Sequence, residues 1–312
     1  MRSSHPSLAV LLALALLGAA CGRGDGPPPA DEVKGTLTIG SGALPESDLI
    51  AEMYTLALEK AGYRITDRTG VGGRDAYLRS IQSGAVDVVP DNLAGVTSWF
   101  DVVKNGAASA AARPVAGGDP ARTLAGLRTL LRDTPVRAGP LSPALHQVSF
   151  AVTKELADRE SLRAVSDLAR LDGQLVLGGP ASCQTDPNCL PGLSRVYGVT
   201  VKDFRPLGEV SGKPVLTALA DKTIQVGMVL SSSGGVAQNS LVVLDDDRGL
   251  QDAGNLLALY RDTVPADARD VVERVNQALT TEKLQELNKK LESDKADPAD
   301  LARLFLRDAG LV

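Results

Sequence analysis

From Leu37 onward the sequence alternates between short apolar runs that predict β-strands and longer stretches with helical periodicity. The first unit is a strand over 37–39, which enters a Gly-Ser-Gly turn at 40–42 and then a helix over 47–61. Strand–helix alternation of this kind is typical of α/β lobes around parallel sheets. With 312 residues the chain is long enough for two such lobes. The sequence therefore predicts an α/β fold with two lobes.

The same pattern divides the chain into the segments of two lobes. In the first lobe we expect strands and helices over 37–39, 47–61, 63–66, 74–83, 86–89, 93–103 and 122–132, with a surface loop at 106–120. In the second lobe we expect them over 148–152, 165–171, 174–177, 190–197, 214–220, 224–229 and 241–244, with one more strand after 199–204. Three final helices are expected over 267–279, 282–291 and 298–308.

This order predicts that one lobe interrupts the other. The first lobe comprises 35–145 plus 256–312, and the second comprises 146–255, so the chain crosses between them near His146 and again near 256–259. A cleft between two α/β lobes, lined by strand ends and helix starts, is a preferred place for a ligand.

The first 21 residues predict a lipoprotein signal peptide. Arg2 precedes an apolar run over 8–17, which is too short to span a bilayer. The run leads into Leu-Gly-Ala-Ala-Cys at 17–21, which resembles a bacterial lipobox and predicts lipidation of Cys21. The alternative is an ordinary secretory signal cleaved near Ala20. Residues 22–34 are rich in Gly, Pro and charge and predict a flexible tether, so we expect the protein on the outer face of the cytoplasmic membrane.

Two further cysteines, Cys183 and Cys189, flank a short turn that contains Pro and Asn. In an exported protein such a close pair favours a disulfide. A metal site is the alternative, but it would need more ligands, and His146 is the only histidine after the leader.

Composition and motifs argue against several functions. The net charge is −5 and no basic stripe is present, so nucleic acid is not an expected partner. The sequence has no Gly-x-Ser-x-Gly, Ser-x-x-Lys or His-Glu-x-x-His motif, and we expect neither an enzyme nor a cofactor or metal. We interpret His146 as a hinge or pocket residue and not as a general base.

The predicted binding residues each follow a strand or lie at a crossing. A strand that ends in Gly-Ser-Gly before a helix leaves backbone N–H groups that can hold a carboxylate or another small polar group. The predicted ligand-binding positions are Ser41, Gly42, Gly73, Asn92, Gln147, Thr185, Ser231 and Ser232.

Several segments together resemble a known family. Pro-Glu-Ser at 45–47, Gly-Gly-Arg at 72–74, the run over 84–90, and the segments 190–198, 241–246 and 284–288 are similar to the substrate-binding proteins of osmoprotectant ABC importers. The resemblance implies a two-lobe, periplasmic-binding-protein-like fold of type II, with two hinge crossings and a central ligand cleft. It also implies delivery of glycine betaine, choline or carnitine to an ABC permease and its ATPase. We expect the protein to be a monomer.

The family holds a quaternary ammonium in a cage of aromatic rings, and this chain departs from that pattern. Asn92 stands where relatives usually have tyrosine, and 230–233 and 43–44 lack rings that relatives often carry. Tyr77, Phe150 and Tyr260 are the aromatic residues expected near the cleft. Two alternatives to a quaternary ammonium carrier therefore stay open: a binder of a more polar, non-quaternary solute, and an exported sensory or interaction protein.

Overall fold

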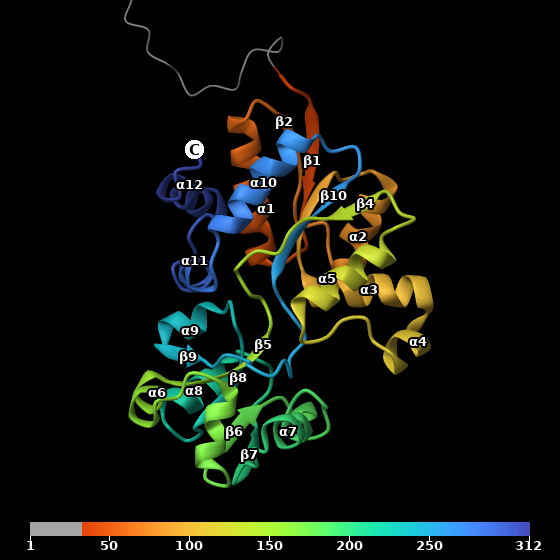
Figure 1. Ribbon diagram of the computed structural model, residues 1–312. Helices are drawn as coiled ribbons and strands as arrows, with labels where there is room; N and C mark the ends of the chain where they lie inside the picture. Colours follow the sequence, from red (N-terminus) through yellow and green to blue (C-terminus); the bar gives the residue numbers. More distant parts are fainter. Residues whose placement is uncertain (1–32) are drawn as a thin grey trace, which may run out of the picture.

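The computed structural model describes residues 33–312, which form two α/β lobes joined by two crossing segments (Figure 1). The leader, Cys21 and nearly all of the predicted tether lie outside the described residues. Among the residues described, no helix is both long enough and apolar enough to cross a membrane.

Each lobe contains one five-stranded sheet. In the first sheet the strand order is β2-β1-β3-β10-β4, and these strands cover Arg64–Arg68, Thr36–Gly40, Val88–Asn92, Leu256–Arg261 and Val136–Ala138. In the second sheet the order is β7-β6-β8-β5-β9, and these strands cover Asp203–Pro206, Val176–Gly179, Val226–Leu230, Val148–Thr153 and Leu241–Val243. The two-lobe α/β prediction is confirmed.

The sheets are mixed, so the expectation of parallel sheets was wrong. Strand β10 runs antiparallel to β3 and β4, and β5 runs antiparallel to β8 and β9. These two strands, β10 and β5, are each fourth in the strand order of their sheet. Each is also the first strand that the chain forms after it crosses from the other lobe. Residues 256–259, expected as the return crossing, are therefore part of β10. An apolar run in the sequence indicates a buried strand, but it does not indicate whether that strand is parallel or antiparallel to its neighbours.

The two crossings run side by side and are hydrogen-bonded to each other. The His146 N–H donates to the Gly254 carbonyl (2.8 Å), and the Leu256 N–H donates to the Ala144 carbonyl (2.9 Å). Gly254 is required at this approach, because a Cβ there would clash with the Gln147 Cβ and with the His146 carbonyl oxygen. The hinge is thus a short antiparallel ribbon.

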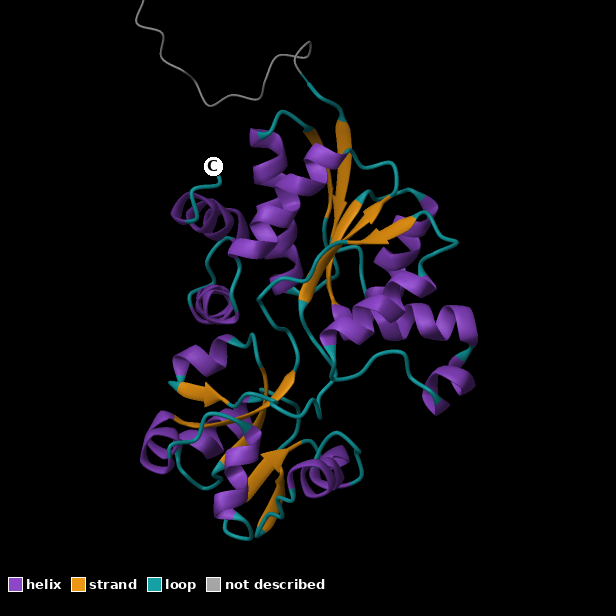
Figure 2. Cartoon of the chain, in the orientation of Figure 1, coloured by secondary structure: helices purple, strands orange, loops and turns teal. Residues whose placement is uncertain are grey.

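Helices cover both sheets (Figure 2). In lobe 1 they are α1 (Pro45–Lys60), α2 (Arg74–Ser83), α3 (Leu93–Asn105), α4 (Ala107–Ala112), α5 (Pro120–Leu130), α10 (Ala266–Ala278) and α12 (Pro298–Asp308). In lobe 2 they are α6 (Lys154–Glu160), α7 (Leu190–Gly192), α8 (Lys213–Ala220) and α9 (Gly234–Gln238). Lobe 2 also has 3₁₀-helices at Val165–Leu171 and Ala181–Gln184 and a π-helical turn at Leu193–Tyr197. The expected loop at 106–120 contains the helix α4, and α6, α9 and β4 were not predicted from the sequence.

The remaining helix, α11 (Thr281–Ser293), contacts both lobes. Leu284 and Leu287 pack into the core that α1, α10 and α12 share. The same helix packs against α9 of lobe 2, and Gly234 of α9 leaves no room for a Cβ, which would clash with the Lys289 backbone nitrogen. Although 256–312 was expected to belong to the first lobe, α11 therefore bridges the two.

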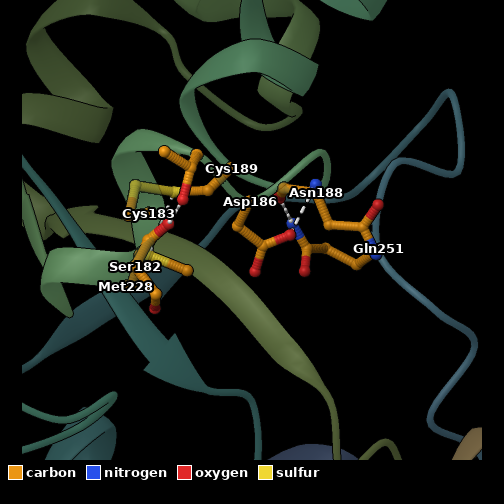
Figure 3. The surroundings of a disulfide bond; sticks show 8 residues. Ser182, Cys183, Asp186, Asn188, Cys189, Met228 and Gln251 are labelled. Carbon is orange, nitrogen blue, oxygen red and sulfur yellow. Dashed lines mark hydrogen bonds between the residues drawn. A yellow bond between two sulfur atoms is a disulfide. The ribbon is translucent and has the colours of Figure 1, made fainter.

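A disulfide joins Cys183 and Cys189 in lobe 2, with the two Cα atoms 5.1 Å apart (Figure 3). The enclosed loop is also held by the Gln251 amide, which donates to the Asn188 carbonyl (2.5 Å). Both cysteines are buried among the apolar side chains of the lobe. The loop is thereby fixed to the segment that leads into the second crossing.

Candidate functional site

A cavity of about 240 Å³ opens where the first sheet meets the crossings. Its lining comes from the turns after β1 and β2, the starts of α1 and α2, the end of β3 and the region of the crossings. The residues are 42–44, 46, 47, 50, 72–74, 77, 90–92, His146 and Leu256. His146 belongs to the first crossing and Leu256 begins β10 directly after the second, so the cavity lies at the end of lobe 1 that adjoins lobe 2. The carboxyl end of β3 contributes to it, as expected for a ligand site in an open α/β sheet.

The first polar group of the cavity is an ion pair between Arg74 and Asp91. Arg74 donates through Nη2 to Asp91 Oδ1 (2.9 Å) and through Nε to both carboxylate oxygens (3.3 and 3.2 Å). The Tyr77 hydroxyl and the Asn92 N–H also donate to Asp91 (2.8 and 2.7 Å). The Asp91 side chain is only 2% exposed, whereas that of Arg74 is 37% exposed. The protein therefore satisfies the carboxylate, while part of the guanidinium remains open to the cavity.

Local structure explains why this guanidinium is held in place. Arg74 begins α2 directly after Gly73, and Asp91 lies at the end of β3, so a turn and the neighbouring strand bring the two together. The guanidinium lies over Gly95, where a Cβ would clash with both Nη2 and Nη1. A side chain at position 95 would displace it.

The second polar group is an ion pair between His146 and Glu46. The His146 Nδ1 lies 2.7 Å from Glu46 Oε1, and these side chains are 20% and 15% exposed. Burial would lower the pKa of His146, but the hydrogen bond and charge of Glu46 outweigh it and raise that pKa. Burial would likewise raise the pKa of Glu46, but hydrogen bonding and charge from His146, with hydrogen bonds from Ser232 and Asn288, lower it. Each partner thus favours the charged form of the other.

Within residues 33–312, Tyr77 is the single Phe, Tyr or Trp side chain that lines the cavity. Phe150 and Tyr260, also expected near the cleft, are each 1% exposed and lie in the cores of lobe 2 and lobe 1, so this expectation was wrong. Both belong to interior strands, whose two faces are covered by helices. The apolar walls of the cavity come from aliphatic side chains such as those of Ile50 and Leu256.

Three of the residues predicted to bind ligand, Gly42, Gly73 and Asn92, line the cavity. Gly42 leaves space for the Tyr77 ring, since a Cβ there would lie 3.0 Å from Tyr77 Cε1. The Asn92 side-chain oxygen accepts from the Gly95 N–H (2.9 Å) and caps α3. This leaves its amide nitrogen as the group that can face a ligand.

Ser41 lies just outside the cavity lining and has a structural role. Its hydroxyl donates to Asp48 and accepts from the Gly70 N–H (2.9 Å), and the residue is fully buried. Two nearby backbone N–H groups, expected to be free for a carboxylate, are already used. The Gly42 N–H donates to Ser47 Oγ (3.1 Å), and the N–H of residue 43 donates to the carbonyl of residue 72 (3.1 Å). The turn therefore binds the following loop and does not present these donors to the cavity.

The other predicted positions lie at the hinge or in lobe 2. Gln147 accepts from the Gly254 N–H (3.0 Å), and the Ser231 hydroxyl donates to a crossing carbonyl, that of residue 145 (2.8 Å). The Ser232 hydroxyl lies 2.9 Å from Nδ1 of residue 146. Thr185 is exposed in the disulfide loop, where its hydroxyl donates to the carbonyl of residue 182 (3.3 Å). These four side chains lie outside the cavity lining, and direct ligand contact by them stays a prediction.

Tyr77, expected near the cleft, does line the cavity, whereas Arg74, Asp91 and Glu46 were not predicted as binding residues. Arg74 and Asp91 lie in or beside the Gly-Gly-Arg and 84–90 segments that carried the family resemblance, which was the available signal. His146 was interpreted as a hinge or pocket residue, and the structure places it at both. No group of three or more His, Cys, Asp or Glu side chains suited to a metal occurs in the described part of the chain.

The chain matches a known protein family over most of its length. The family described as the substrate binding domain of ABC-type glycine betaine transport systems matches residues 35–308. The chain belongs to this family. As a member, the protein binds a small solute for import, and its two lobes are those of the periplasmic substrate-binding fold.

Individual relatives within this family are distant. A glycine-betaine-binding protein of Pseudomonas aeruginosa is 26% identical over 296 residues, which is 89% of each chain. The carnitine transport binding protein OpuCC of Listeria monocytogenes is 22% identical over 162 residues, 51% of this chain and 52% of its own length. Among solved structures, apo YehZ of Escherichia coli aligns with a TM-score of 0.78 at 20% identity, covering 89% of this chain and 99% of that one. A glycine betaine/carnitine/choline ABC transporter structure aligns with a TM-score of 0.76, also at 20% identity, over 88% and 99%.

Proposed function

We propose that this substrate-binding protein captures an osmoprotectant-type solute between its lobes and delivers it to the permease and ATPase of an ABC importer. The supporting observation is the cavity at the strand ends of lobe 1, which adjoins the hinge and combines aliphatic walls with two ion pairs. The names of the relatives, which include glycine betaine and carnitine binders, agree with this class of solute.

Within that class, the solute we propose is more polar than a trimethylammonium compound. A quaternary ammonium is held by several aromatic faces, each contributing on the order of 0.5–2 kcal/mol. Among the described residues, Tyr77 is the single Phe, Tyr or Trp side chain at the cavity, and its hydroxyl is already bonded to Asp91. Arg74 and the Asn92 amide nitrogen instead offer donors to hydroxyl, carbonyl or carboxylate groups. Glycine betaine should therefore bind weakly or not at all.

The test is isothermal titration with glycine betaine, together with a thermal-shift screen of betaines, choline, carnitine, sugars and polyols. A specific solute at about 100 times its dissociation constant should add about 2.7 kcal/mol to the free energy of unfolding. Asn92→Tyr should strengthen glycine betaine binding by adding a ring. Asn92→Ala is the matched control, because it removes the same helix cap without adding a ring. Micromolar binding of glycine betaine by the wild type would refute the more polar solute and show that further rings complete the cage.

The proposal includes a lipid anchor on Cys21, with the tether at 22–34 holding a monomer at the outer face of the cytoplasmic membrane. The lipobox-like sequence before Cys21 supports this. A solute carrier that must reach its permease repeatedly gains local concentration from such an anchor.

A further inference from the structure

The His146 imidazole lies between parts of both lobes. Its Nδ1 is 2.7 Å from Glu46 Oε1, in the first turn of α1 in lobe 1. The same nitrogen is 2.9 Å from Ser232 Oγ, in the segment that follows β8 in lobe 2. His146 itself belongs to the first crossing, where its N–H is bonded to Gly254 of the second. One ring therefore connects the first lobe, the hinge and the second lobe.

Helix α11 completes the network. The Asn288 amide donates to Glu46 and to the Ser232 carbonyl, the latter at 2.8 Å. Gln285, on the same helix, donates to the Ser231 carbonyl (2.6 Å). Because Asn288 is only 4% exposed, water does not readily replace its bonds. The link between the lobes thus depends on a largely buried set of hydrogen bonds centred on one ion pair.

We propose that the Glu46–His146 pair is a proton-controlled latch, which ties lobe 2 to α1 through Ser232 while His146 is protonated and loosens that tie when the proton leaves. A neutral imidazole can still donate one hydrogen bond, but it no longer neutralises the charge of Glu46. The carboxylate is then left poorly compensated in a largely buried place. This makes His146 a positioning residue for the lobes, and it acts whichever solute the cavity holds.

The charges around the pair come from four elements. Glu46 is the partner on α1, and across the cavity Arg74 on α2 lowers the pKa of His146 while Asp91 on β3 raises it. On α11, burial raises the pKa of Glu292, and the nearby charge of Glu46 raises it further. The remaining contacts of the pair, from lobe 2 and α11, are neutral. Among these charges, Glu46 is the nearest and has the largest effect on the protonation of His146.

The direction of the pH effect follows from the two pKa shifts. The pKa of His146 is raised in the folded protein, so its stabilising contribution is complete below its unfolded value of 6.5 and is lost as the pH rises through the folded value. The pKa of Glu46 is lowered, so its contribution is present above its unfolded value of 4.5 and is lost as the pH falls through the folded value. The latch should hold between those limits and loosen on the alkaline side.

The first measurement is an NMR titration of the imidazole in the full chain. The chain has only two histidines, His5 and His146, and the signal of His146 is the one that disappears in His146→Asn. We expect a midpoint above 6.5, the ordinary histidine value, in the wild type and a lower midpoint in Glu46→Gln. A wild-type midpoint at or below that value, or one that Glu46→Gln leaves unchanged, would overturn the proposal.

The second measurement asks whether the lobes respond. Spin labels attached to Val103→Cys in α3 and Arg205→Cys in β7 report the distance between the lobes. Cys21→Ser removes the remaining free thiol, and the two cysteines of the disulfide do not react with the label. The distance distribution should broaden as the pH rises through the His146 midpoint. In Ser232→Ala the imidazole should still titrate with a raised midpoint, but the distance should no longer follow it. A wild-type distribution that does not change with pH, or a Ser232→Ala response equal to that of the wild type, would contradict a latch.

Discussion

Replacing Arg74 with Met should destabilise the protein much more than the loss of an ordinary surface ion pair. Asp91 is 2% exposed, so removing Arg74 leaves a buried carboxylate without its counter-charge. Breaking a buried pair by removing one partner costs about 3–5 kcal/mol. Arg74 is 37% exposed, so water enters part of the vacated space, and Tyr77 and the Asn92 N–H still donate to Asp91. We therefore expect a loss of about 2–3 kcal/mol in the free energy of unfolding.

Urea denaturation followed by circular dichroism measures this loss, and a thermal scan should show a fall in Tm of about 5 °C. Arg303→Met is the matched control, since Arg303 forms a helix-surface pair with Asp300 in which the side chains are 59% and 77% exposed. Such pairs contribute about 0–1 kcal/mol.

The double variant Arg74→Met/Asp91→Asn separates charge from packing. Asparagine at the second position keeps the size of the side chain without its charge, so the double variant should be more stable than Arg74→Met alone. A buried, charge-dependent pair is refuted if Arg74→Met lowers the free energy of unfolding no more than Arg303→Met does, or if the double variant is no more stable than Arg74→Met.

Two further predictions concern the cysteines. Cys21→Ala should release the protein from the membrane fraction, because an acyl anchor holds far better than a tether alone, and fractionation that finds the variant still on the membrane would refute lipidation. Mass spectrometry of unreduced protein should show Cys183 linked to Cys189, and Cys183→Ser/Cys189→Ser should lower the free energy of unfolding by about 2 kcal/mol. Free thiols in protein from an oxidising compartment would contradict the linkage.

Helical periodicity and caps predicted several elements closely. The helices over 74–83 and 298–308 begin and end where expected, because a glycine stops the first and Asp297-Pro298 starts the second. Helix α9 was missed because its Gly-Gly start has low helix propensity. Its helical form instead accompanies the close packing of Gly234 against α11, a contact between distant segments that no local pattern contains.

The candidate site, too, could be predicted from the sequence only where local pattern decides the structure. Gly42, Gly73 and Asn92 could be placed at the cavity because each lies at or just after the end of a strand, and the ends of adjacent strands meet. The roles of Ser231 and Ser232 could not, since a hydroxyl after a strand serves a ligand or a hinge equally well. Which of these a serine hydroxyl serves depends on whether the two crossings and α11 approach it closely. That approach is decided by tertiary packing.

The strand order of lobe 1 has a consequence for the way the chain folds. All five strands of lobe 2 lie between Val148 and Val243, so that sheet can be completed from one continuous stretch of chain. In lobe 1, β4 pairs only with β10, which the chain supplies after the whole of lobe 2. Closing such a long loop is slow, and meanwhile β3 and β4 both present unpaired edges. A chain interrupted before Leu256 would therefore carry a finished second lobe beside a first sheet that is still open to pairing with other chains.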